Sequence, residues 1–251
     1  MNSKLYRWRK KRVKKTAGIT PRSSQTKPGT LYVVSGPIGN LEDITVRALR
    51  ILQNVSIVAA EDTFSTQRLL SHYGLRATLT TYDHRNHREK AEILMDQLRK
   101  RHDVALISDC GTPVIYDPGS WLVHRAVDEG ISVTSVPGPS VPIAALAVAG
   151  LSGDAFLFQG ALPRSRKLLQ RFFQSVNRER RTMVFFVSPE RLRSTMRLME
   201  AILGNRHVLV AANLTTESER LIWGDVSQLL RTQALQLRDA EVTVVVEGRG
   251  R

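Results

Sequence analysis

Short apolar segments alternate with segments of helical periodicity along the chain after residue 30. In the first half, strands are expected at residues 31–34, 57–60, 104–107 and 131–136, and helices at residues 41–53, 86–101, 120–128 and 140–149. Strands that alternate with helices form βαβ units, in which parallel strands are buried between layers of helices. The pattern therefore predicts an α/β fold with a mostly parallel sheet.

A second series of the same kind follows the glycine-containing segment at residues 150–154. Strands are expected at residues 155–158, 183–187, 208–211 and 242–246, and helices at residues 164–176, 189–203 and 224–232. A break between two complete series is typical of a domain junction. We therefore expect two α/β domains, at residues 31–150 and 151–251, preceded by an N-terminal arm at residues 1–30.

The N-terminal arm dominates the net charge of +14. Ten of the 37 Lys and Arg residues lie in residues 1–30, which contain no acid, so 27 bases are balanced by 23 acids in the rest of the chain. Like charges repel one another, and such a segment is expected to be disordered and to bind polyanions such as RNA through counterion release. A solubilising arm and an organellar transit peptide are the alternatives.

Several classes of protein find no support in the sequence. A single cysteine, Cys110, cannot form an internal disulfide and fits a reducing compartment. No apolar run approaches the roughly 18 residues of a membrane span. The histidines form no metal-ligand pattern, and neither a P-loop nor an elbow-serine motif is present. These observations predict a cytoplasmic protein with no membrane segment and no metal site, or a protein of an organellar matrix if the arm is a transit peptide.

Four loops follow expected strands of the first domain, where ligands bind in open α/β sheets. They are residues 36–40, 60–63, 108–119 and 137–140. Pro37 has no N–H to donate, so the first loop is not a pyrophosphate cradle and could be a simple tight turn. The third loop contains two Gly, two Pro and two Asp, which suits close approach of a flat ligand to a rigid backbone.

Polar residues in these loops are candidates for chemistry. Glu61 and Asp62 follow a buried strand and could bind a hydroxyl or act as a general base, although Asp62 or Thr63 could instead cap the next helix. Ser140 is expected to begin an alanine-rich helix, whose free N-terminal amides could bind a carboxylate.

Together, the four loops resemble the motifs of the tetrapyrrole methylase superfamily, in the branch that methylates a ribose 2′-oxygen of 16S ribosomal RNA. The resemblance covers residues 31–248 and is carried by Gly36-Pro37-Ile38-Gly39-Asn40, Ala60-Glu61-Asp62-Thr63, Ser108-Asp109 with Gly111-Thr112-Pro113, and Pro137-Gly138-Pro139-Ser140. It implies two α/β domains, the second with a mixed sheet, and a homodimer that acts on the small ribosomal subunit.

The resemblance also implies S-adenosylmethionine as cofactor, bound in a cleft between the domains. The residues that it places at the cofactor are Pro37, Ser108, Asp109, Gly111, Ile115, Ser140, Val141, Phe186, Leu214 and Val244. Glu61 and Asp62 are the candidates for orienting or deprotonating the ribose hydroxyl, and the sequence does not choose between them.

Polar positions of the family pattern are replaced in this chain. Phe64 stands where the family has Arg, and Val187 stands where it has Glu. Loss of an Arg removes a bidentate grip on phosphate. A catalytically silent protein that binds ribosomal RNA or a ribosome as a structural or assembly component is therefore the main alternative to an RNA methyltransferase. A methyltransferase for a small tetrapyrrole-like substrate is the other.

Overall fold

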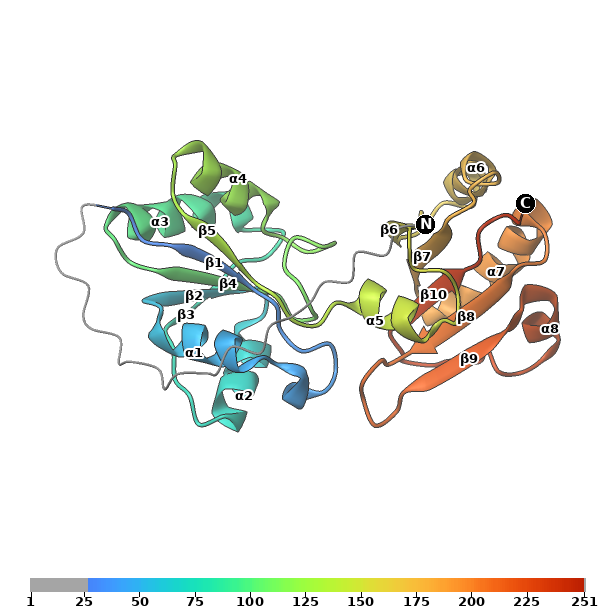
Figure 1. Ribbon diagram of the computed structural model, residues 1–251, viewed down its shortest axis with the longest axis horizontal. Helices are drawn as coiled ribbons and strands as arrows, with labels where there is room; N and C mark the ends of the chain where they lie inside the picture. The colour runs from blue at the N-terminus through green and yellow to red at the C-terminus, as the bar shows by residue number, and fades with distance from the viewer. Residues whose placement is uncertain (1–26, 251) are drawn as a thin grey trace, which may run out of the picture.

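Two five-stranded sheets lie next to each other in the computed structural model, which describes residues 27–250 (Figure 1). The first sheet is parallel throughout and has the order β3-β2-β4-β1-β5. Its strands are β1 (Leu31–Val34), β2 (Ile57–Ala60), β3 (Leu79–Thr81), β4 (Val104–Ile107) and β5 (Val133–Val136). All four residues of the central strand β4 are buried, as expected for a strand covered on both faces.

Helices cover both faces of the first sheet. They are η1 (Leu41–Asp43), α1 (Val46–Asn54), α2 (Thr63–His72), α3 (His87–Arg99) and α4 (Ser120–Asp128). Figure 1 shows α3 and α4 on one side of the sheet and α1 and α2 on the other. Each pair has its own apolar cluster, one centred on Leu94 and Leu106 and the other on Leu52 and Leu70.

The second sheet is mixed, as predicted. Its order is β6-β7-β10-β8-β9, with β6 and β7 parallel and the other neighbours antiparallel. The strands are β6 (Phe156–Ala161), β7 (Thr182–Val187), β8 (His207–Ala212), β9 (Arg220–Asp225) and β10 (Val242–Val246). Helices α6 (Arg166–Ser175), α7 (Pro189–Leu203) and α8 (Val226–Arg231) share an apolar cluster with it.

Helix α5 (Val141–Val148) joins the two halves. It follows the last strand of the first sheet, yet it packs against β7 and β10 of the second. Ala145 and Leu146 of this helix, together with Ile38 from the loop after β1, cover the face of the second sheet that carries Val184 and Val245. The two sheets are therefore connected through a shared apolar core.

Three local expectations were wrong. The helix predicted at residues 41–53 is broken at Ile44, because the Thr45 side chain accepts a hydrogen bond from the Ala48 N–H at 3.1 Å and begins α1 there. Residues 220–225 form the edge strand β9, not a polar segment with a helix starting at Gly224. The capping box expected at Asn86 is absent, because its amide oxygen accepts the Asp83 N–H instead.

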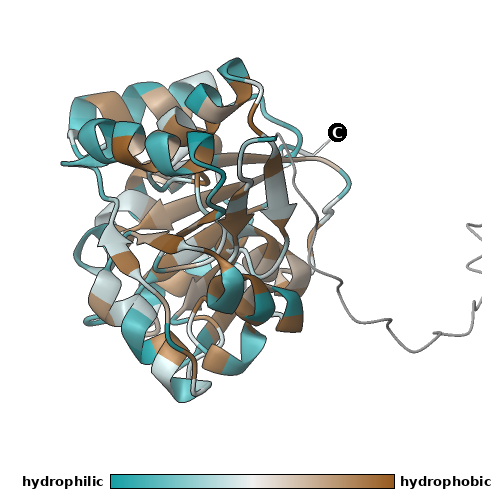
Figure 2. Cartoon of the chain, turned by 90° about the vertical axis from the view of Figure 1, so that its left-hand side faces the viewer, coloured by the Kyte–Doolittle hydropathy of each residue, from teal (hydrophilic) through white to brown (hydrophobic). Residues whose placement is uncertain are grey.

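In Figure 2 the strands of the interior are mostly apolar, whereas the helices around them carry both polar and apolar residues. Among residues 27–250, no helix combines the length and the apolar character needed to cross a membrane. The prediction of a basic arm falls almost entirely on residues outside the described part of the chain.

Candidate functional site

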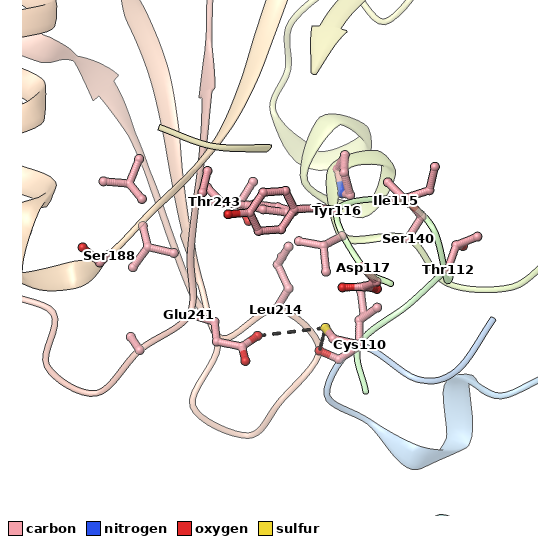
Figure 3. A pocket seen from close by; sticks show the side chains of 18 of the residues that line it. Cys110, Thr112, Ile115, Tyr116, Asp117, Ser140, Ser188, Leu214, Glu241 and Thr243 are labelled. Carbon is pink, nitrogen blue, oxygen red and sulfur yellow. Dashed lines mark hydrogen bonds between the residues drawn. The ribbon is translucent and has the colours of Figure 1, made fainter. Parts of the chain in front are cut away.

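A cleft of about 330 Å³ lies between the two sheets (Figure 3). This volume falls within the roughly 300–1,000 Å³ typical of small-molecule sites. The first half contributes residues of the loops after β1, β4 and β5, and the second contributes residues of β7, β10 and the loop after β8. The walls are largely apolar, through side chains such as Ile38, Ile115, Phe186 and Leu214.

Backbone and side-chain hydrogen bonds hold three loops of the first half together. The Gly36 N–H donates to the Gly111 carbonyl at 2.8 Å, and the Gly111 N–H donates to the Pro37 carbonyl at 3.1 Å. The Thr112 hydroxyl lies 2.8 Å from that of Ser35 and 3.1 Å from the Pro139 carbonyl. The loop after β4 is therefore fixed to the loops after β1 and β5.

The same loop contains strained backbone. Val114 and Tyr116 have positive φ angles of 77° and 71°, which side chains with a Cβ rarely adopt. Strain of this kind costs about 1–3 kcal/mol per residue and persists only where the surroundings enforce it. It places Tyr116 against the second half of the molecule.

Tyr116 bridges the two halves at the cleft. Its ring meets Phe186 of β7 edge to face, with centroids 5.7 Å apart. It also lies over Gly160 of β6, where an added Cβ would come within 2.6 Å of the ring. A side chain at position 160 would therefore displace the tyrosine.

Four carboxylates gather where β2 and β4 end, at Glu61, Asp62, Asp109 and Asp117. Asp109 accepts a hydrogen bond from the Asp62 N–H at 3.2 Å, and its own N–H donates to Glu61 at 3.4 Å. Asp62 also accepts the Phe64 N–H at 2.8 Å and so caps α2, which is the structural alternative that the sequence left open.

Burial and mutual repulsion change the acidity of this group. Burial, followed by the negative charge of Glu61, raises the pKa of Asp109. The same two causes raise the pKa of Asp117 to about 6, and one of its carboxylate oxygens is buried without a hydrogen-bond partner among the described residues. The Asp117 carboxyl group therefore changes its protonation state close to neutral pH.

Cys110 lies on the cleft wall beside this group. Its Sγ is 4.0 Å from Oε2 of Glu241, across the cleft in Figure 3. Burial, with the repulsion of Glu241, raises the pKa of the thiol to about 12. The thiol is thus protonated at neutral pH and is a poor nucleophile.

Half of the ten residues predicted to bind the cofactor line the cleft. They are Ile115, Ser140, Val141, Phe186 and Leu214. Pro37, Ser108 and Asp109 line a separate hollow of about 210 Å³ beside α2, and Gly111 holds the loops together as described above. Val244 packs on the other face of its sheet, towards Phe185 and α7.

Other cleft residues were not predicted individually as site residues, namely Tyr116 and Asp117 within the predicted loop at residues 108–119, and Ser188, Glu241 and Thr243. The alternation of side chains along β10 could have identified Thr243, because neighbouring residues of a strand point to opposite faces of the sheet. Among the described residues, no group of three or more His, Cys, Asp or Glu side chains could hold a metal ion.

The fold is similar to that of solved methyltransferases. A cobalt precorrin-4 methyltransferase of cobalamin biosynthesis superposes with a TM-score of 0.66 at 20% identity, covering 92% of this chain and 98% of that one. Uroporphyrin-III C-methyltransferase from Thermus thermophilus gives 0.61 at 18% identity, covering 87% and 94%. At these identities the likeness shows the fold.

The sequence comparison identifies the family. A model for Tetrapyrrole (Corrin/Porphyrin) Methylases matches residues 30–230, and the chain belongs to this family. "Ribosomal RNA small subunit methyltransferase I" of Thermotoga maritima is 41% identical over 221 residues, covering 88% of this chain and 99% of that protein. The protein of the same name from Escherichia coli O157:H7 is 40% identical, covering 90% and 80%. The chain therefore belongs to a family of methyltransferases, whose methyl donor is S-adenosylmethionine.

The residues of the cleft fit this donor. Its adenine ring is flat with apolar faces, its amino-acid end carries an ammonium and a carboxylate, and its sulfur is positive. The apolar walls suit the ring, and the carboxylates of Asp117 and Glu241 suit positive charge. Helix α5 begins at the cleft, and its N-cap residue Ser140 makes no side-chain capping bond that would occupy the first amides.

Proposed function

We propose that this protein transfers a methyl group from S-adenosylmethionine to a ribose 2′-oxygen of small-subunit ribosomal RNA. The observation that carries the proposal is the similarity to ribosomal RNA small subunit methyltransferases across 88% of the chain. The family match over residues 30–230 includes the cleft-lining loops that follow β1, β4, β5, β7 and β8. We further propose that the protein acts in the cytoplasm, where bacterial small subunits are assembled, and that a homodimer is its working form.

Residues of both halves would hold the methyl donor. Ile115, Phe186 and Leu214 would enclose the adenosine of the donor. Ser140 and Val141, at the start of α5, would bind the carboxylate of the donor's amino-acid end. Bound there, the donor supplies a methyl group on a positively charged sulfur. The fixed loops of the first half hold the site in one geometry, which lowers the entropic cost of aligning the two reactants.

The carboxylate group would receive the proton of the ribose hydroxyl. Asp62 is occupied as the cap of α2, which favours Glu61 of the two residues first considered. Glu61 raises the pKa of Asp109 and Asp117, so one proton taken up by the group relieves repulsion among all three. We therefore propose that Glu61 and Asp117 share the role of general base.

Transfer of a labelled methyl group from S-adenosylmethionine to isolated small ribosomal subunits tests the function. We expect one labelled ribose per subunit, located by nuclease digestion and mass spectrometry. A folded protein that labels neither subunits nor free ribosomal RNA would contradict the proposal.

A catalytically silent RNA-binding protein is the second candidate. Phe64, 79% exposed at the start of α2 beside the carboxylate group, is the observation that favours it, since the family has Arg there. Calorimetric titration with S-adenosylmethionine separates the two candidates. Binding at one site per chain supports the enzyme, whereas RNA binding without any affinity for S-adenosylmethionine supports the silent protein.

A further inference from the structure

A basic groove lies between α6 and α7, on the second half of the molecule. It has a volume of about 420 Å³ and is lined by Arg164, Arg166, Leu169, Arg191, Ser194, Arg197, Leu198 and Ala201. Both helices begin near it, at Arg166 and Pro189, so the positive ends of two helix dipoles add to the charge of the side chains. We call this surface the α6–α7 groove.

Within the described part of the chain, the arginines of the α6–α7 groove form no ion pair with an acid. The ion pairs of residues 27–250 include none of Arg164, Arg166 or Arg197, and all three side chains are exposed. Arg191 is held in place by a 2.8 Å hydrogen bond to the Pro163 carbonyl. Clustered guanidinium groups repel one another, and an anion in the groove would remove that repulsion.

A second hollow connects this groove to the cleft. It has a volume of about 520 Å³ and shares Tyr116, Phe186 and Ser188 with the cleft. It shares Arg164 and Arg191 with the α6–α7 groove. The one acid on its wall is Glu190. A chain molecule with one unit in the cleft can therefore continue along a concave and increasingly basic path.

We propose that the α6–α7 groove binds backbone phosphates of the substrate RNA next to the nucleotide that enters the cleft. This inference rests on the proposed function for the identity of the strand. The planar fork of arginine matches phosphate oxygens in pairs, and arginines make up all four charged positions of the groove. A concave path suits a flexible single strand better than the flat surface of a membrane.

The test compares two triple variants of the full-length protein. Arg164→Gln, Arg166→Gln and Arg197→Gln remove the charge of the groove. Arg50→Gln, Arg76→Gln and Lys100→Gln remove the same charge from exposed positions on the first half and serve as control. Fluorescence anisotropy with a labelled small-subunit RNA fragment, at several salt concentrations, gives affinity and salt slope.

We expect the groove variant to bind RNA at least tenfold more weakly than the control variant. Its salt slope should be smaller by about 1 for each phosphate contact removed, and affinity should fall to a similar extent for all sequences. Calorimetric affinity for S-adenosylmethionine should be unchanged in both variants, which shows that the cleft is intact.

Two results would overturn the proposal. One is equal RNA affinity of the two variants, and the other is intact RNA binding with selective loss of binding to phosphatidylserine vesicles or to polyglutamate. The proposed function fails separately. If the unmodified protein binds RNA but methylates none, the proposed function is wrong. The RNA affinities of the groove and control variants, measured by anisotropy, still decide whether the groove holds the strand.

Discussion

The two halves of the molecule meet at one cleft but contribute to it differently. The first half contributes loops that are fixed by hydrogen bonds and contain strained residues such as Tyr116, and it carries all four carboxylates at the ends of β2 and β4. The second half contributes strand faces, such as the one with Phe186 and Thr243, and the basic α6–α7 groove. We infer that the first half determines the chemistry, that both halves hold the methyl donor, and that the second half holds the RNA.

The largest expected effect is on catalysis, from Asp117→Asn in the first half. Loss of a general base lowers rates by about 100-fold or more, and the transfer of labelled methyl measures it. Because the base must be ionised, the rate of the unmodified protein should rise with pH to a plateau above about 6. Affinity for S-adenosylmethionine should change much less than the rate.

Asp117→Asn should stabilise the folded protein although it slows catalysis. Burial disfavours the ionised form of Asp117 and raises its pKa in the folded state, so its contribution is favourable at low pH and is lost as pH rises through about 6. At pH 7, Asp117→Asn should raise the free energy of unfolding by about 1–2 kcal/mol, allowing for partial exposure. Asp43→Asn, on the surface, is the control. An unchanged rate of methyl transfer by Asp117→Asn would contradict the inference that the first half carries the catalytic groups.

The contact between the halves is tested by Gly39→Ala. A Cβ at this position would come within 2.5 Å of the Leu214 carbonyl oxygen and 2.8 Å of the Thr215 hydroxyl. Overpacking of this kind costs about 1–3 kcal/mol, and urea unfolding measures it. We also expect weaker binding of S-adenosylmethionine, because Leu214 lines the cleft. At Gly153 the added Cβ meets Leu146 at an ordinary 3.6 Å, so Gly153→Ala should leave affinity unchanged.

Asp62 allows a structural role to be separated from a chemical one. Asp62→Ala removes the cap of α2 and should cost about 1 kcal/mol, whereas Asp62→Asn keeps a capping oxygen and should cost little. Thermal unfolding of both variants measures the difference. If Asp62→Asn keeps its stability but loses methyl transfer, Asp62 belongs among the catalytic residues after all.

The smallest expected effect is at Tyr116, where the halves touch. Tyr116→Ala removes the edge-to-face contact with Phe186, worth about 0.5–1.5 kcal/mol, and should weaken binding of S-adenosylmethionine several-fold. Tyr116→Phe keeps the ring and should match the unmodified protein in the same calorimetric titration. Equal weakening in both variants would assign the effect to the hydroxyl group.

The sequence predicts regular elements where packing and periodicity agree. The apolar run of β4 and the mixed second sheet were predicted, from periodicity and from the family resemblance respectively. The edge strand β9 was missed because it pairs with β8 alone, which leaves most of its side chains partly exposed and its pattern weak. The boundary between domains at residue 150 stays a prediction.

The candidate site was predicted less completely, for a physical reason. Loop motifs identify residues near the cleft, such as Ile115 and Ser140, because turn geometry is encoded locally. The raised pKa of Asp117 depends on burial and on Glu61, which is far away in the chain. Val244 was assigned without regard to strand alternation, and Thr243 occupies the cleft-facing position instead.

The packing of α5 determines where the molecule can bend. Since α5 is attached to the second sheet, the segment that would act as a hinge for opening the cleft is residues 137–139, before the helix, and not the glycines after it. That segment reads Pro-Gly-Pro, and each proline ring fixes one backbone torsion. Of these three residues, only Gly138 is free to rotate about both backbone torsions. Its backbone lies close to Ser35, which would be 3.0 Å from an added Cβ, and this contact restricts the rotation of Gly138. Ligand entry should therefore proceed through side-chain motion at the cleft mouth and not through rotation of one half against the other.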